Sequence, residues 1–124
     1  MDDPSFAYRK LVVYQYARRY VNDIYLLTKR YPAEERFALC NQLQRASVSI
    51  TSNIAEGMSR FSEKDKVHFL EIAFGSLLET MSQLEVSLDL GYISIEDYNN
   101  MERQVVDISR MLSGLRKTYL SRIG

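Results

Sequence analysis

Apolar residues recur at spacings of three and four along most of the chain, which is the pattern of amphipathic helices. The clearest series lies within residues 63–90, and a second follows within residues 95–121. In both, the apolar positions share one side of the predicted helix, as in a packed helical bundle. The two series are Val67, Leu70, Phe74, Leu77, Met81, Leu84, Leu88 and Tyr98, Met101, Val105, Ile108, Leu112, Leu115, Tyr119.

Two further helices are predicted over residues 7–30 and 33–58. Tyr31-Pro32 separates them, because proline disfavours a helical conformation in the residue before it and suits the first turn of the next helix. No segment alternates apolar and polar residues between turn signals, so no strand is predicted.

Four long helices with short connections favour an all-α fold, an antiparallel up-and-down four-helix bundle. Ser62 and Ser94 are the predicted N-caps of the last two helices, and Gly91 is the predicted stop between them. The length allows one domain with its own core, so residues 1–124 are assigned to a single domain.

The predicted helix over residues 7–30 carries an apolar arc that covers roughly half its circumference, more than the ~100° that one neighbouring core requires. Tyrosine combines an apolar ring with a polar hydroxyl, which suits partly hydrated contact surfaces. This helix is therefore predicted to pack against both its own core and a second copy of the chain. The tyrosines assigned to that oligomer interface are Tyr14, Tyr16, Tyr20 and Tyr25.

Residues 42–60 combine an apolar seam with an opposite strip of small polar side chains. Serine, threonine and asparagine are mediocre helix formers, because their side chains compete for backbone hydrogen bonds. Two interpretations stay open: the small residues allow a neighbouring helix to approach, or they form a polar groove that binds a ligand. The predicted polar groove consists of Arg45, Ser49, Asn53, Glu56, Glu71 and Glu79.

A tight turn after residue 58 sets the register of the two helices that flank this groove. Residues whose numbers sum to about 120 should lie at similar heights, which places Arg45 near Gly75. We therefore predict an ion pair between Arg45 and Glu79 or Glu71. Glycine inside a helix costs ~1 kcal/mol relative to alanine, so close approach of a neighbouring helix is predicted at Gly75.

Composition adds limits on partners and location. Basic and acidic side chains are equal in number, 16 of each, so net charge provides no global attraction to nucleic acid or to an anionic membrane. The single Cys40 lies on an apolar helical face, which predicts a buried thiol and fits a reducing cytoplasm. The N-terminus lacks the apolar segment of a signal peptide, and no run reaches the ~18–20 apolar residues of a membrane span. We expect a cytoplasmic protein with no membrane partner.

The sequence shows no established pattern for catalysis or cofactor binding. A di-metal site in a helical bundle needs repeated Glu-x-x-His pairs, and this chain offers only Asp65-x-x-His68 as a partial match. Cys40 and His68 lie on different predicted helices, which argues against a thiol nucleophile, and there is no P-loop. We expect no catalytic residue, no metal and no cofactor.

Several motifs resemble those of the bacterial 23S rRNA intervening-sequence proteins, a family of four-helix bundles. They are L-V-V-Y-Q-Y-A, Y-L-L-T-K-R-Y-P-A-E-E-R-F, S-V-S-I-T-S-N-I-A-E-G-M-S-R, F-L-E-I-A-F-G-S-L-L-E and L-G-Y. The resemblance covers about residues 6–120. It implies a small cytoplasmic bacterial protein that assembles as a ring-shaped homopentamer and whose biochemical role is not established.

The family is also similar to the accessory proteins of diversity-generating retroelements, which are basic pentamers that bind nucleic acid and a reverse transcriptase. Here Gln44 precedes Arg45 where members often have two arginines, and Thr51 stands where they often have proline. The basic character is therefore weaker in this chain, and the kink that proline would produce is absent. The family's polar signature falls on Arg45, Ser49, Asn53, Glu56, Gly57, Arg60, Glu71, Gly75 and Glu79.

Besides a second copy of the chain, the resemblance makes nucleic acid, RNA or DNA, the leading expected partner. The alternative is a protein-interaction scaffold or adaptor with no nucleic-acid ligand. Phosphate neutralisation provides most nonspecific affinity, so zero net charge limits tight binding. The expected nucleic-acid contacts are Arg36, Arg60, Lys64 and Lys66, around the second predicted helix and the turn after it.

Overall fold

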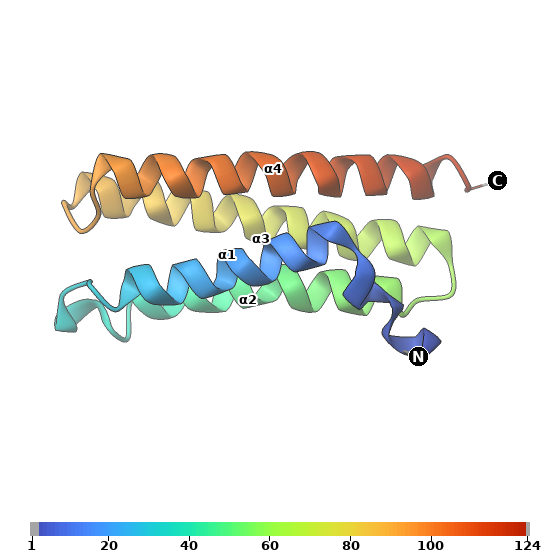
Figure 1. Cartoon of the computed structure of the whole chain (residues 1–124), viewed down its shortest axis with the longest axis horizontal. Helices are drawn as coiled ribbons and strands as arrows, with labels where there is room; N and C mark the ends of the chain where they lie inside the picture. Colours follow the sequence, from blue (N-terminus) through green and yellow to red (C-terminus); the bar gives the residue numbers. More distant parts are fainter. Residues whose placement is uncertain (1–2, 124) are drawn as a thin grey trace.

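The computed structural model describes residues 3–123, and the regular secondary structure of that range is entirely helical, which confirms the all-α prediction (Figure 1). Successive α-helices run in opposite directions along one long axis (Figure 1). Within that range, no helix has both the length and the hydropathy that crossing a bilayer requires. Residues 1–2 and 124 of the predicted domain lie outside it. The α-helices are α1 (Val12–Thr28), α2 (Leu39–Met58), α3 (Glu63–Asp89) and α4 (Ile95–Leu120), and the 3-10 helices are η1 (Pro4–Lys10) and η2 (Ala33–Glu35).

The first two long helices begin later than predicted. Leu11 adopts an extended conformation, with φ −68° and ψ 127°, and separates η1 from α1. Pro32 is followed by the short η2, and α2 begins only at Leu39. None of residues 33–38 is buried, so tertiary packing does not stabilise a helix there.

The apolar seams of α1 to α4 meet in one core, as their spacing predicted. Leu77, Leu84 and Ile108 are among its fully buried side chains. Tyr20 of α1 reaches across this core, and its hydroxyl lies 2.8 Å from Oγ1 of Thr80 in α3. Thr80 Oγ1 itself donates to the carbonyl of Leu77, so the Tyr20 hydroxyl is the donor to Thr80 and the buried polar pair is satisfied.

The ends of α3 and α4 follow the predicted signals. Ser62 and Ser94 cap their N-termini, each accepting a hydrogen bond of 3.0 Å from the backbone N–H three residues later. Gly91 follows α3 with a φ of 78°, a conformation that glycine adopts without steric cost. The N–H of Tyr92 donates to the carbonyl of Ser87 at 2.9 Å, which completes a Schellman motif.

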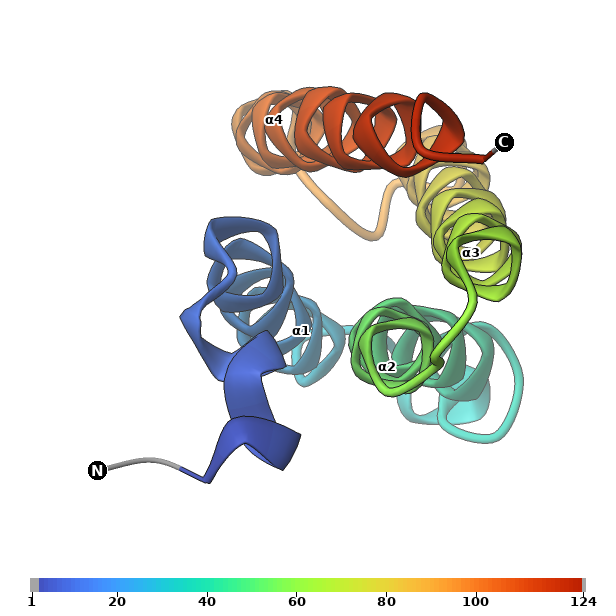
Figure 2. The ribbon, with the colours of Figure 1, turned by 90° about the vertical axis from the view of Figure 1, so that its right-hand side faces the viewer.

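α4 crosses the bundle obliquely, with its N-terminal part toward α1 and its C-terminal part over α3 (Figure 2). Two polar contacts at 2.9 Å reach α4 from this part of the chain. Asp23, in the C-terminal half of α1, accepts from Gln104, and Arg30, just after the end of α1, pairs with Asp97. Toward the other end of the bundle α1 and α4 diverge (Figure 2). This divergence leaves the N-terminal part of α1 less covered by its own chain than α2 and α3 are.

Candidate nucleic-acid interface

The small side chains of the predicted polar groove lie at the contact between α2 and α3 and bond to one another. Ser49 Oγ lies 2.9 Å from Oγ of Ser76 on the facing helix. Asn53 Nδ2 donates to the carbonyl and to the hydroxyl of Ser49, at 2.8 and 3.0 Å. Because these hydrogen bonds stay within the chain, the geometry favours helix packing over ligand binding as the role of Ser49 and Asn53.

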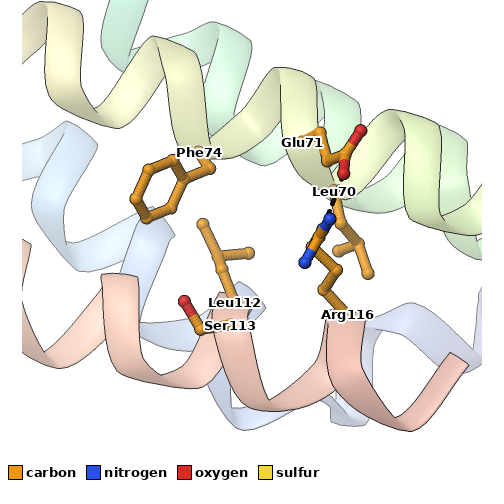
Figure 3. A pocket seen from close by; sticks show the side chains of 6 residues that line it. All are labelled: Leu70, Glu71, Phe74, Leu112, Ser113 and Arg116. Atoms are coloured by element: carbon orange, nitrogen blue, oxygen red, sulfur yellow. Dashed lines mark hydrogen bonds and ion pairs between the residues drawn. The ribbon is translucent and has the colours of Figure 1, made fainter. Parts of the chain in front are cut away.

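The predicted ion pair of Arg45 with Glu71 or Glu79 is wrong in the part of the chain that the structure describes. Glu71 turns toward α4, where its Oε2 lies 2.6 Å from Nε of Arg116 (Figure 3). Glu79 accepts a hydrogen bond of 3.2 Å from Gln83 of its own helix. Arg45 is exposed and takes part in none of the ion pairs of that range. Residues at similar heights along the bundle form an ion pair only if their side chains also point toward each other around their helix axes.

A pocket of about 290 Å³ lies between α3 and α4 (Figure 3). The apolar side chains of Leu70, Phe74 and Leu112 line it, and the Glu71–Arg116 ion pair lies beside them. Both charged partners are nearly half exposed, and pairs of this kind contribute only ~0–1 kcal/mol. Sequence reasoning missed this pocket, because only the packing of α4 on α3 brings its two sides together. Its lining suits a small apolar group.

The predicted oligomer interface is wrong in one residue. Tyr20 is fully buried beside Thr80 and therefore cannot contact a second chain. Burial raises the pKa of its phenol well above the ordinary value. Its position follows from the buried seam of α1, at whose centre it falls. Tyr14 and Tyr16 are partly buried and Tyr25 is 40 % exposed, so these three stay accessible for contact with another molecule.

The structure separates the expected nucleic-acid contacts into two groups. Arg36 lies in the connection between α1 and α2, whereas Arg60, Lys64 and Lys66 lie after the far end of α2. A helix of 20 residues is about 30 Å long, so the two groups are at opposite ends of the bundle. Only three of the four predicted cations can therefore share one contact surface.

Two of these three cations already have partners within the chain. Arg60 forms an ion pair with Glu56, at 2.5 Å, and its guanidinium lies over the ring of Phe69, at 4.7 Å from the centroid. Lys66 donates to the backbone carbonyl of Arg60. Lys64 is exposed in the first turn of α3. The turn is thus held in place by its own charged side chains, and Lys64 projects from it.

Charge is unevenly distributed along the long axis of the molecule. We call the end that holds η1, the α2–α3 turn, the start of α3 and the end of α4 the basic end (Figure 1). The acidic end holds the α1–α2 connection, the end of α3 and the start of α4 (Figure 1). Basic side chains outnumber acidic ones at the first, and the reverse holds at the second. The basic end carries Arg9, Lys10, Arg60, Lys64, Lys66, Arg116, Lys117 and Arg122 against Asp3, Glu56, Glu63, Asp65 and Glu71; the acidic end carries Glu34, Glu35, Glu85, Asp89, Glu96, Asp97 and Glu102 against Lys29, Arg30, Arg36 and Arg103.

Cys40 is a core residue in the folded chain. Its Sγ lies 3.6 Å from the carbonyl of Thr28, and burial raises the pKa of the thiol. A higher pKa means less reactive thiolate at neutral pH. Among residues 3–123, no three histidine, cysteine, aspartate or glutamate side chains gather so as to hold a metal ion.

A family model and a solved structure are both similar to this chain. The model of a family described as 23S rRNA-intervening sequence protein matches residues 9–114. A solved structure from Bacteroides thetaiotaomicron, of a protein with unknown function from the S23 ribosomal protein family, is similar with a TM-score of 0.79 and 28 % identity. That similarity covers 86 % of this chain and 96 % of the other. No curated protein matches the chain.

Proposed function

This chain belongs to the 23S rRNA-intervening sequence protein family, and from this premise we propose that it is a non-enzymatic homo-oligomer that binds nucleic acid, RNA or DNA. The observation that carries the proposal is the basic end. The zero net charge conceals it, because the fold gathers an excess of carboxylates at the opposite end. A local positive field attracts phosphates even when the whole molecule is neutral.

Assembly compensates for the few cations that one chain can offer. Arg60 and Arg116 are already paired with carboxylates, which leaves each copy a weak site. Weak sites repeated around a symmetric ring gain affinity through effective concentration, without any new contact. The proposed assembly is the cytoplasmic, ring-shaped homopentamer that the family resemblance implies. Tyr14, Tyr16 and Tyr25 of α1 are its proposed contacts with the next copy.

Fluorescence anisotropy with labelled RNA and DNA across a salt series tests nucleic-acid binding. The logarithm of affinity should fall linearly with the logarithm of salt concentration, by about 0.7 per phosphate contact on single strands. Replacing Lys64 and Lys117 together with alanine removes two exposed cations from the basic end and should flatten this slope. The matched control replaces Lys29 and Arg103, two exposed cations of the acidic end, and should leave the slope unchanged.

Circular dichroism and light scattering should give the same helix content and mass for both double variants, since all four side chains are exposed. If both double variants changed the salt slope equally, the basic end would be ruled out as the binding surface. Absence of binding by the unmodified protein at low salt would remove the proposed function itself.

The acidic end favours a second candidate, a protein-interaction scaffold with no nucleic-acid ligand. Phe37 lies there, 86 % exposed, with the guanidinium of Arg36 over its ring at 5.7 Å. Exposed aromatic residues and arginines are enriched at the centres of protein contact surfaces. A protein partner that co-purifies equally with and without nuclease, from a chain that binds no oligonucleotide, would support the scaffold.

A further inference from the structure

Phe61 is the most exposed large apolar side chain in the described part of the molecule. It lies in the turn between α2 and α3, where its ring is fully accessible to solvent. Burial of a phenylalanine ring is favourable, so this chain loses that stabilisation by leaving the ring in water. A ligand that covers the ring would recover it.

The turn holds Phe61 on a rigid support. Backbone N–H groups of Ser59 and Arg60 donate to carbonyls in the last turn of α2, at 3.1 Å each. Ser62 then caps α3 through its hydroxyl. Because the residues on both sides of Phe61 are fixed by hydrogen bonds, little backbone entropy is lost when a ligand meets the ring.

Cations and further aromatic rings surround this turn. Arg60 precedes Phe61 and Lys64 follows it in the first turn of α3. From α4, the Tyr119 hydroxyl lies 3.4 Å from Sδ of Met58 at the end of α2. Arg122 is placed over the Tyr119 ring, at 5.3 Å from the centroid. Aromatic rings among positive charges are the combination with which proteins hold unpaired bases and their phosphates.

We propose that Phe61 is a stacking platform for an unpaired base, and that the basic end binds single-stranded nucleic acid in preference to duplex. This inference rests on the proposed function, since it specifies which form of nucleic acid the basic end takes. An unpaired base presents its flat face freely, whereas a side chain that enters a duplex must first unstack a base step. Lys64, which projects from the turn, then meets a phosphate next to the stacked base.

An anionic lipid surface is a poorer fit for the same turn. Stable membrane attachment needs a sizeable apolar face or two separate anchors, and the turn offers one ring. Lipid is therefore treated as a competing outcome of the test.

The absence of tryptophan from the sequence allows a direct optical test. Phe61→Trp introduces one indole at the proposed platform, and base stacking should quench its fluorescence. Phe37→Trp is the matched control, because Phe37 is also a highly exposed ring next to an arginine but lies at the acidic end. Titration with an oligothymidine or oligouridine of about 10 nucleotides should quench the first indole and leave the second unchanged.

Affinity of substituted proteins completes the test. Phe61→Ala should weaken binding of the single strand by roughly 5- to 100-fold, and Phe61→Tyr should retain it, because tyrosine keeps an aromatic face. Phe61→Leu keeps apolar bulk without that face and should behave like Phe61→Ala. Duplex binding and the salt slope should not change, because no charge is removed.

The outcomes separate this inference from the proposed function. Equal single-strand affinity of the unmodified protein and Phe61→Ala, with salt-dependent binding intact, overturns the stacking role alone. Tighter binding of duplex than of single strands overturns the preference. No binding of either form overturns both. Quenching of the indole at position 61 by phosphatidylserine vesicles, but not by oligonucleotides, assigns the surface to lipid and overturns the inference.

Discussion

At the scale of single residues, two helical glycines have opposite surroundings. A Cβ at Gly57 would lie 2.8 Å from Cβ of Phe69, so α2 and α3 approach closely there. At Gly75, where close approach was predicted, no atom of a neighbouring helix lies within 4 Å of an added Cβ. The prediction therefore named the wrong glycine. The sequence shows which helices contain a glycine. Only the crossing point of two helices shows which of these glycines the packing requires.

Alanine substitutions at these two glycines should have opposite effects on the free energy of unfolding. Gly57→Ala should lower it by roughly 1 kcal/mol or more, since overpacking of ~1–3 kcal/mol exceeds the gain in helix propensity. Phe69 Cβ is fixed to the backbone and cannot move aside cheaply. Gly75→Ala should raise it by ~0.5–1 kcal/mol. Urea denaturation measures both, and a loss at Gly75 would indicate that a second chain lies against it.

At the scale of helices, stability should vary from one element to the next. α2 and α3 pack tightly along their contact, whereas α1 and α4 diverge toward the basic end (Figure 2). η1 contains no buried residue, and an extended residue separates it from α1. Local opening needs little energy where few apolar side chains are buried.

Hydrogen exchange should reveal these differences in local stability. Backbone amides of η1 should exchange fastest, those of α1 more slowly, and those in the middle of α2 and α3 slowest of all. Mass spectrometry after timed exchange and peptic digestion measures it. The tight contact at Gly57 provides an internal control, because Gly57→Ala should speed exchange in α2 more than in η1. Slow exchange in η1 of the unmodified protein would contradict this and would indicate that another copy covers it.

At the scale of the whole molecule, the fold turns an electrically neutral chain into a bipolar one. Its two ends differ in sign because the end of α3 and the start of α4, which meet at the acidic end, are rich in glutamate and aspartate. In a ring whose copies are related by rotation, equivalent ends lie on the same face when the bundles are parallel to the symmetry axis. Such a ring would carry one basic face and one acidic face.

Light scattering should give a mass about five times the 14.5 kDa of one chain. Tyr25→Glu should lower that mass, because a glutamate at this position would place an unpaired charge in the contact between copies. Helix content should not change, because Tyr25 is exposed in the single chain. Leu90→Glu is the control, since Leu90 is similarly exposed but lies at the end of α3, away from the proposed tyrosine contacts. A clean monomer at micromolar concentration would refute the assembly.

Local sequence patterns are enough to predict the presence of the helices, their buried seams and the serine and glycine residues at their ends. Those features depend on residues a few positions apart, such as Leu77 and Leu84 on one face of α3 or Ser62 at its first turn. Burial of an apolar stripe and capping of a helix end are local requirements, and local spacing therefore predicts them.

The pairing of polar groups, by contrast, depends on how the helices pack against one another. This packing placed Tyr20 against Thr80, joined Glu71 to Arg116 in place of Arg45, and put Arg36 at the opposite end from Arg60. Each result depends on how far the helices are rotated about their axes and where they cross. The whole core sets those quantities at once through close packing, so no short stretch of sequence contains them.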